Sequence, residues 1–201
     1  MRRTAVAIVA VCGIAAAAGL EARQTLTKQD ADTMDRKLSA IIGRGNEAPT
    51  KTSKPLRTVF TDREVNAYFK FNGQSFMPVG VLEPTVTIGD AGLVKARAIV
   101  DLDAVRKSKT RGWTDPLTYV TGRVEVLAAG TLQAADGKGV FNLQSASLAG
   151  VPIPKSVLQE VISYYTKSQE LPQGFDLEKP FELPQKIRQV DLQRGTAIVL
   201  Q

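Results

Sequence analysis

The sequence contains no histidine, and its 201 residues include a single cysteine. Without histidine the chain can build neither a Ser-His-Asp triad, nor a Cys-His pair, nor a metal site that relies on imidazole. The side chain that titrates unaided near neutral pH is also missing. Aromatic residues are scarce, at 6%. We therefore expect a protein that is not an enzyme, with no catalytic residue, no metal and no cofactor.

The remaining composition is that of a globular chain, with 43% hydrophobic and 23% charged residues. Several common functional motifs are missing from it: G-x-S-x-G, the P-loop, G-x-G-x-x-G after a strand, and C-x-x-C. The net charge is +6. A chain of this length is expected to form one domain.

The N-terminus has the organisation of a secretory signal peptide. Arg2 and Arg3 precede an uncharged run from Ala5 to Ala18, which ends in small residues of the A-x-A type. We predict cleavage near Ala18 or Gly19 and a periplasmic or secreted mature protein; an uncleaved segment anchored in the inner membrane is the alternative. Removing 18 of the 201 residues leaves 183, takes away Cys12, and lowers the charge from +6 to +4 because two arginines are lost. Export also argues against a nucleic-acid partner.

Helical periodicity over residues 27–42 predicts an amphipathic helix that ends at Gly43 and Gly45. The polar, glycine- and proline-containing stretch 43–57 reads as a linker, so we expect this helix to pack loosely. The predicted organisation is a signal peptide (1–18), an N-terminal helix with a polar linker (19–57), and a single α+β domain (58–201).

Local signals in the domain are clearer. Thr61 and Glu64 form a capping box for a helix over 62–71. From residue 80 the hydrophobic period changes to two, and Asp136-Gly137 is typical of a hairpin turn. The apolar residues of the strand near 139–149 change face in mid-run, which indicates a bulge. We predict an α+β fold, with an antiparallel curved sheet of about six strands and amphipathic helices on one face.

The apolar face of the predicted sheet is rich in alanine. Small side chains there allow either close packing of helices on the sheet or an apolar groove between a helix and the sheet. The residues that would line such a ligand-binding groove are Val94, Ala96, Ala98, Val126, Ala128, Val157, Val161 and Tyr165.

A basic segment precedes the tryptophan of the chain. A solvated loop explains it, and so does contact with an anionic membrane surface, because cations bind lipid headgroups and tryptophan favours the interface. The residues of this contact would be Arg106, Lys107, Lys109, Arg111 and Trp113.

Two further groups have alternative interpretations. Asp101 and Asp103 are predicted on the polar face of one strand, where a solvated face is favoured over a carboxylate pair for catalysis or cation binding. An apolar cluster near Asn72-Gly73 can be core or the mouth of a ligand site. Its members are Phe69, Phe71, Phe76 and Met77.

The order of short motifs resembles small exported bacterial envelope proteins. The run 61–68 resembles a capped helix near their start, and residues 151–154, 181–184 and 195–199 follow in similar order. The pattern, over about residues 58–200, is similar to the tubular lipid-binding (TULIP-like) and related helix-on-curved-sheet groups. The resemblance implies binding or shuttling of an acyl-chain lipid in the cell envelope.

We therefore expect a domain that binds an apolar or lipid-like ligand in the envelope. The alternative is an envelope protein–protein interaction module without a ligand cavity. The sequence identifies neither the ligand nor the oligomeric state.

Overall fold

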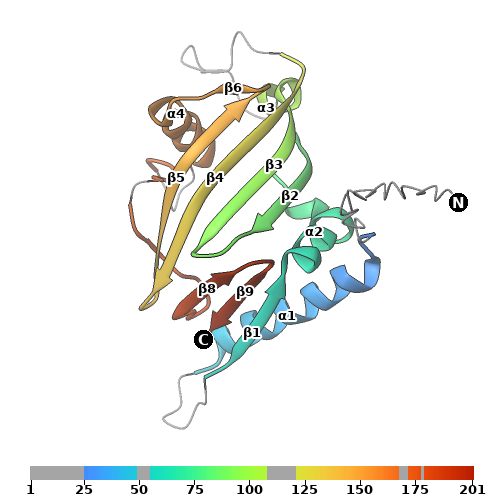
Figure 1. The fold of residues 1–201 in the computed structure, drawn as a ribbon, viewed down its shortest axis with the longest axis vertical. Coiled ribbons are helices and arrows are strands. Elements are labelled where there is room, and N and C mark those ends of the chain that lie inside the picture. Colours follow the sequence, from blue (N-terminus) through green and yellow to red (C-terminus); the bar gives the residue numbers. More distant parts are fainter. Residues whose placement is uncertain (1–24, 49–54, 108–120, 168–171, 178) are drawn as a thin grey trace, which may run out of the picture.

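The computed structural model describes residues 25–48, 55–107, 121–167, 172–177 and 179–201. Within them lies one antiparallel sheet with the order β1-β9-β8-β4-β3-β2, extended beyond β4 by β5, which pairs with β6 and β7. The fold is α+β, as predicted. In Figure 1 the β2–β3 hairpin lies above the β8–β9 hairpin, next to the long strand β4.

The strands of this sheet are β1 (Arg57–Thr61), β2 (Val81–Ile88), β3 (Leu93–Asp101), β4 (Arg123–Ala135), β5 (Lys138–Leu148), β6 (Val151–Pro152), β7 (Phe181–Glu182), β8 (Gln189–Gln193) and β9 (Thr196–Leu200). The helices are α1 (Lys28–Asn46), α2 (Asp62–Phe71), α3 (Leu102–Lys107) and α4 (Lys155–Thr166), with a short 3₁₀ helix η1 (Gly73–Phe76).

The prediction of about six strands is too low. Periodicity identified β2, β3, β4, β5, β8 and β9, whereas the described residues form a nine-stranded sheet. The additional strands are short, and β6 and β7 have two residues each. Strands of this length have no period to detect, and they exist because a neighbouring strand pairs with them.

The hairpin between β4 and β5 follows the sequence closely. Asp136 and Gly137 both have positive φ, 53° and 77°, as a two-residue turn of type I′ requires. The register shifts between Ala129 and Gly130, which confirms the predicted bulge. One extra residue in β5 brings Phe141 and Ala146 to the same face of the sheet although their sequence positions differ by an odd number.

The predicted end of the first helix is wrong, because α1 continues through both glycines to Asn46. A glycine costs about 1 kcal/mol in a helix, but at Gly45 the chain approaches another segment closely. A Cβ there would lie 2.8 Å from the Cβ of Gln185. A larger residue would not fit at this contact.

The expectation that this helix packs loosely is also wrong. Ile41 of α1 is 5% exposed and forms a buried cluster with Phe60 and Val199. Figure 1 shows α1 running across the strands that carry these residues.

Polar contacts join α1 to α2. Lys37 donates to both carboxylate oxygens of Glu64 at 2.7 Å and to the carbonyl oxygen of Val59, while Arg63 donates to Asp30 at 2.9 Å. Glu64 and Asp30 also close the capping boxes of their own helices. The two helix starts are therefore fixed to each other.

The third β-strand ends earlier than its alternating pattern predicts. Asp101 is its last residue, and its carboxylate accepts a hydrogen bond from the backbone N–H of Ala104 at 2.9 Å. This bond caps α3, so Leu102 turns inward and is 3% exposed. Asp103 therefore lies in a helix rather than on the strand face of Asp101.

Candidate functional site

One face of the sheet at β2, β3, β4 and β5 is not covered by any described helix (Figure 1). Strand register places Thr85 opposite Arg97, Arg97 opposite Leu127, and Leu127 opposite Ser147. These side chains share a face, because directly paired residues of antiparallel strands point the same way.

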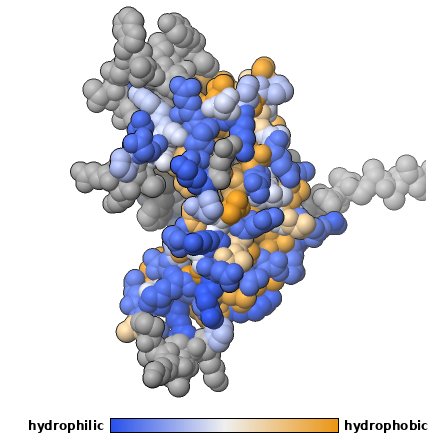
Figure 2. Space-filling view, turned by 90° about the vertical axis from the view of Figure 1, so that its left-hand side faces the viewer, coloured by the Kyte–Doolittle hydropathy of each residue, from blue (hydrophilic) through white to orange (hydrophobic). Residues whose placement is uncertain are grey.

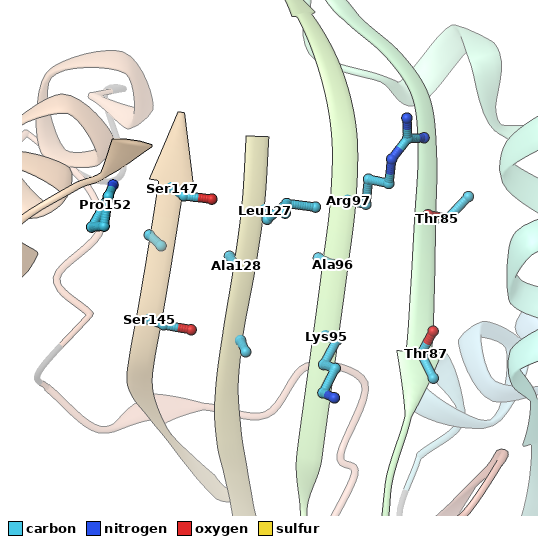
Figure 3. Close-up of a pocket in the computed structure, with 12 residues that line it drawn as sticks. Thr85, Thr87, Lys95, Ala96, Arg97, Leu127, Ala128, Ser145, Ser147 and Pro152 are labelled. Carbon is cyan, nitrogen blue, oxygen red and sulfur yellow. The ribbon is translucent and has the colours of Figure 1, made fainter. Parts of the chain in front are cut away.

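A shallow depression of about 450 Å³ lies on this face, and Figure 3 shows its residues. We call it the sheet hollow. Its wall side chains come from alternate positions of β2, β3, β4 and β5, together with Pro152 of β6. Its floor is the main chain at Ala96, Ala128 and Ala146, whose side chains face the other way. The lining residues are Thr85, Thr87, Lys95, Ala96, Arg97, Leu127, Ala128, Ala129, Ser145, Ala146, Ser147 and Pro152.

The charges of the sheet hollow are positive. Arg97 donates through Nε to Glu125 at 2.5 Å, with side chains 44% and 39% exposed, and Figure 3 shows its guanidinium leaning from β3 towards β2. Lys95 is exposed, two residues along the same strand. None of the described residues that line the hollow is a carboxylate.

A larger depression lies beside it, between α2, η1 and β2. It has a volume of about 650 Å³, and we call it the α2–β2 recess. Its lining residues are Leu26, Asn66, Phe69, Lys70, Gln74, Met77, Val81, Leu82, Glu83, Pro84 and Thr85. Thr85 lines both depressions, so they meet at this residue.

Two local features build the recess. The pairing of β2 with β3 is interrupted between Leu82 and Thr85, where Glu83 has a φ of 47° and Pro84 has no N–H to donate. On the other side, the Asn66 amide of α2 donates to the carbonyl oxygen of Val86 at 2.8 Å and accepts from its N–H at 2.7 Å. These bonds hold α2 against the edge of β2.

The sequence pointed to part of this recess. Phe69 and Met77 belong to the apolar cluster for which core packing and a ligand mouth were both considered, and both line the recess. The β2 residues were missed, because a strand with an irregular pairing shows no regular alternation at Glu83 and Pro84.

The predicted groove occupies the opposite face of the sheet. Strand register places the strand residues of this groove on one shared face. The same face carries Ala134, which is paired with Val190, and Val190 packs against the buried cluster of Ile41, Phe60 and Val199. These strand residues are Val94, Ala96, Ala98, Val126 and Ala128. Only two of them, Ala96 and Ala128, also line the sheet hollow, and they do so from its floor.

The helical residues of that groove lie on α4, which contacts β5. Val157 is 47% exposed and Val161 is half-buried. The side chain of Tyr165 lies outside the described part of the structure. The groove between the alanine face and α4 thus stays a prediction, and it would lie on the opposite side of the sheet from the side chains of the sheet hollow.

The predicted membrane contact is described only at its start. Lys109, Arg111 and Trp113 lie outside the described residues. Arg106 has a side chain only 14% exposed and pairs with Asp103, whereas Lys107 at the end of α3 is exposed.

Asp101 and Asp103 both form hydrogen bonds that stabilise the local fold. The backbone N–H of Ala104, and secondarily the side chain of Arg123, lower the pKa of Asp101. Asp103 accepts from the N–H of Gly122 at 3.0 Å as well as from Arg106. Across the described ranges, no group of three or more acidic or cysteine side chains is placed to hold a metal ion. No helix in those ranges is both long and apolar enough to cross a membrane.

Comparisons with known proteins leave the family open. No protein-family model and no curated protein matches the chain. Among solved structures, the chain is similar to the crystal structure of a lipopolysaccharide binding protein, with 14% sequence identity and a TM-score of 0.21. The likeness covers 77% of this chain but 45% of the other. It is faint, and at this TM-score it carries no argument about function.

Proposed function

We propose that the chain is an exported, non-enzymatic protein of the bacterial cell envelope that binds an apolar or lipid-like ligand in the α2–β2 recess. The observation that carries the proposal is the recess itself. Its volume of about 650 Å³ lies in the range of small-molecule sites, roughly 300–1,000 Å³. Six of its eleven lining residues are hydrophobic: Leu26, Phe69, Met77, Val81, Leu82 and Pro84.

Exposure at the recess supports the same conclusion. Leu82, which lines the recess, is 36% exposed although it is a large hydrophobic residue. An apolar ligand would remove such surface from water, which contributes roughly 25 cal/mol per Å². The signal-like N-terminus supports placement in the envelope.

Binding of the uncharged fluorescent probe N-phenyl-naphthylamine tests the proposal. We expect the purified protein to increase the probe's fluorescence, and Leu82→Gln to weaken binding about fivefold through the loss of about 1 kcal/mol of apolar contact. The control is Ile42→Gln, which alters a 48% exposed isoleucine about 24 Å along the chain of α1 from the recess. Absence of binding, or an equal loss in both variants, would overturn the proposal.

A protein–protein interaction module remains the second candidate. Val151 is 66% exposed on β6 and Val157 is 47% exposed at the start of α4. Figure 2, which views this side of the molecule, shows hydrophobic residues in a broken band between hydrophilic ones. A contiguous patch is the usual mark of an interface, so this candidate is the weaker of the two. Two results together would favour the interaction module: the protein binds no fluorescent probe, and a partner that binds the wild type fails to bind Val151→Gln.

A further inference from the structure

The two depressions differ in charge in a way that specifies one kind of ligand. The recess lining has one cation and one carboxylate, Lys70 and Glu83, whose formal charges cancel, and six of its eleven residues are hydrophobic. The sheet hollow next to it has Lys95 and Arg97 and no carboxylate among its described lining residues. A molecule that extends across both depressions therefore meets large hydrophobic side chains without net charge at one end, and positive charge at the other.

The two surfaces are close enough for one molecule to span them. Thr85 belongs to both and is paired directly with Arg97 on the neighbouring strand. Adjacent strands are about 4.8 Å apart, so the cationic row begins one strand from the edge of the recess. Thr87 is paired with Lys95 in the same way.

Lys95 and Arg97 have N–H groups that can donate hydrogen bonds to a ligand. Glu125 contacts Arg97 at Nε. Among the described residues, no hydrogen bond or ion pair involves the two terminal nitrogens of Arg97 or the amine of Lys95. Hydroxyl groups surround them, on Thr85, Thr87, Ser145 and Ser147. Amines, guanidinium nitrogens and hydroxyls are the donors that carboxylate and phosphate oxygens accept from.

We propose that the ligand is an anionic amphiphile whose acyl chain occupies the α2–β2 recess and whose carboxylate or phosphate lies on Lys95 and Arg97. This assignment rests on the proposed function, because it takes the recess as the apolar site. It goes further by assigning the polar end of the ligand to the open face of the sheet. A fatty acid and an acyl phospholipid both have the required chemistry.

Ligands with the same chain and different polar ends test the charge requirement. We expect the protein to bind dodecanoate more tightly than dodecanol and dodecyltrimethylammonium, and lysophosphatidylglycerol more tightly than lysophosphatidylcholine. Raising the salt concentration should weaken the anionic ligands selectively. Of the two anions, dodecanoate and the lysophosphatidylglycerol with the same dodecanoyl chain, the one that binds more tightly identifies the polar end as a carboxylate or a phosphate; either supports the proposal.

Charge variants test the location. We expect Lys95→Gln to weaken dodecanoate binding about two- to fivefold, the range of an exposed ion pair, and to leave dodecanol binding unchanged. The matched control is Lys138→Gln, an exposed lysine on β5 about 23 Å along that strand from Ser145. A selective loss in Lys70→Gln instead of Lys95→Gln would overturn the proposed position of the head group.

The outcomes separate this inference from the proposed function. If dodecanol binds as tightly as dodecanoate and Lys95→Gln changes neither, the head-group inference fails while an apolar site remains. If no ligand of the series binds, both fail. Circular dichroism of Lys95→Gln checks that its fold is intact, which we expect for a substitution of an exposed side chain.

Discussion

At the start of α1, one carboxylate has a pKa far from its ordinary value. Hydrogen bonds from Arg63 and then from Thr27 lower the pKa of Asp30 from 3.8 to about 2. A depressed pKa means that the folded protein holds the ionised form more strongly than the unfolded chain does. The resulting stabilisation is complete above the unfolded pKa and is lost as the pH falls towards the folded pKa.

We therefore predict a pH-dependent defect in Asp30→Asn. The variant should have a lower Tm than the wild type at pH 7, and the difference should shrink as the pH falls through the window between 3.8 and about 2. Thermal unfolding followed by circular dichroism at a series of pH values measures it. Asp35→Asn, at an exposed position of the same helix, is the control and should not show this course. A Tm difference that stayed constant down to pH 2 would contradict the assignment.

Side chains whose role depends on their immediate neighbours were the easiest to predict. Thr61 and Glu64 form the expected capping box, and each accepts a hydrogen bond from the other's backbone N–H. Asp103 was harder, because its alternation with Asp101 fits a strand as well as the first turn of a helix. The cap on Ala104 decides between them, and a period of two does not contain that information.

At the scale of elements, the outer edge of β2 is closed by a side chain rather than a strand. The Asn66 amide forms both hydrogen bonds to Val86 that another strand would form. Exposed strand edges promote pairing with other chains, and proteins cover them for this reason. The same residue keeps α2 at the recess, so edge protection and recess geometry depend on one amide.

Removing that amide should be costly. We predict that Asn66→Ala lowers the free energy of unfolding by about 1–3 kcal/mol, because it leaves the N–H and carbonyl oxygen of Val86 without these bonds. Urea denaturation measures the loss, and hydrogen exchange should show faster exchange at the Val86 amide. Asn142→Ala on β5, where the side chain is exposed, should change stability by less than about 0.5 kcal/mol. Equal stability of the two variants would refute the role of Asn66.

The elements of the candidate site could be predicted better than its location. Periodicity found the strands β2 to β5 and the helix α2. The alanine face was the natural choice for a groove, but both depressions involve positions that read as polar or irregular. Lys95 and Arg97 alternate as a solvated face, and their surface is hollowed because the main chain at Ala96 and Ala128 forms its floor. The recess depends on the interrupted pairing at Glu83, a tertiary feature.

At the scale of the molecule, α1 ties the first described residues to the last. Gln201 donates through its side-chain amide to the carbonyl oxygen of Ile41 at 2.8 Å, and Ile41 packs with Val199 of β9. These contacts join residues about 160 positions apart. The sequence predicted the helix but not its partner, because amphipathicity identifies an apolar face without naming the surface that covers it.

If α1 is an integral part of the core, it should unfold together with the sheet. We predict that Ile41→Ala, at a position 5% exposed, lowers the free energy of unfolding by about 2–5 kcal/mol. Its matched control is Ile42→Ala, one residue away and 48% exposed, which should cost less than about 0.5 kcal/mol. Hydrogen exchange distinguishes the two architectures. An integral α1 loses protection together with β9 in Ile41→Ala, whereas a helix that only rests on the sheet would lose its own protection and leave that of β9 unchanged.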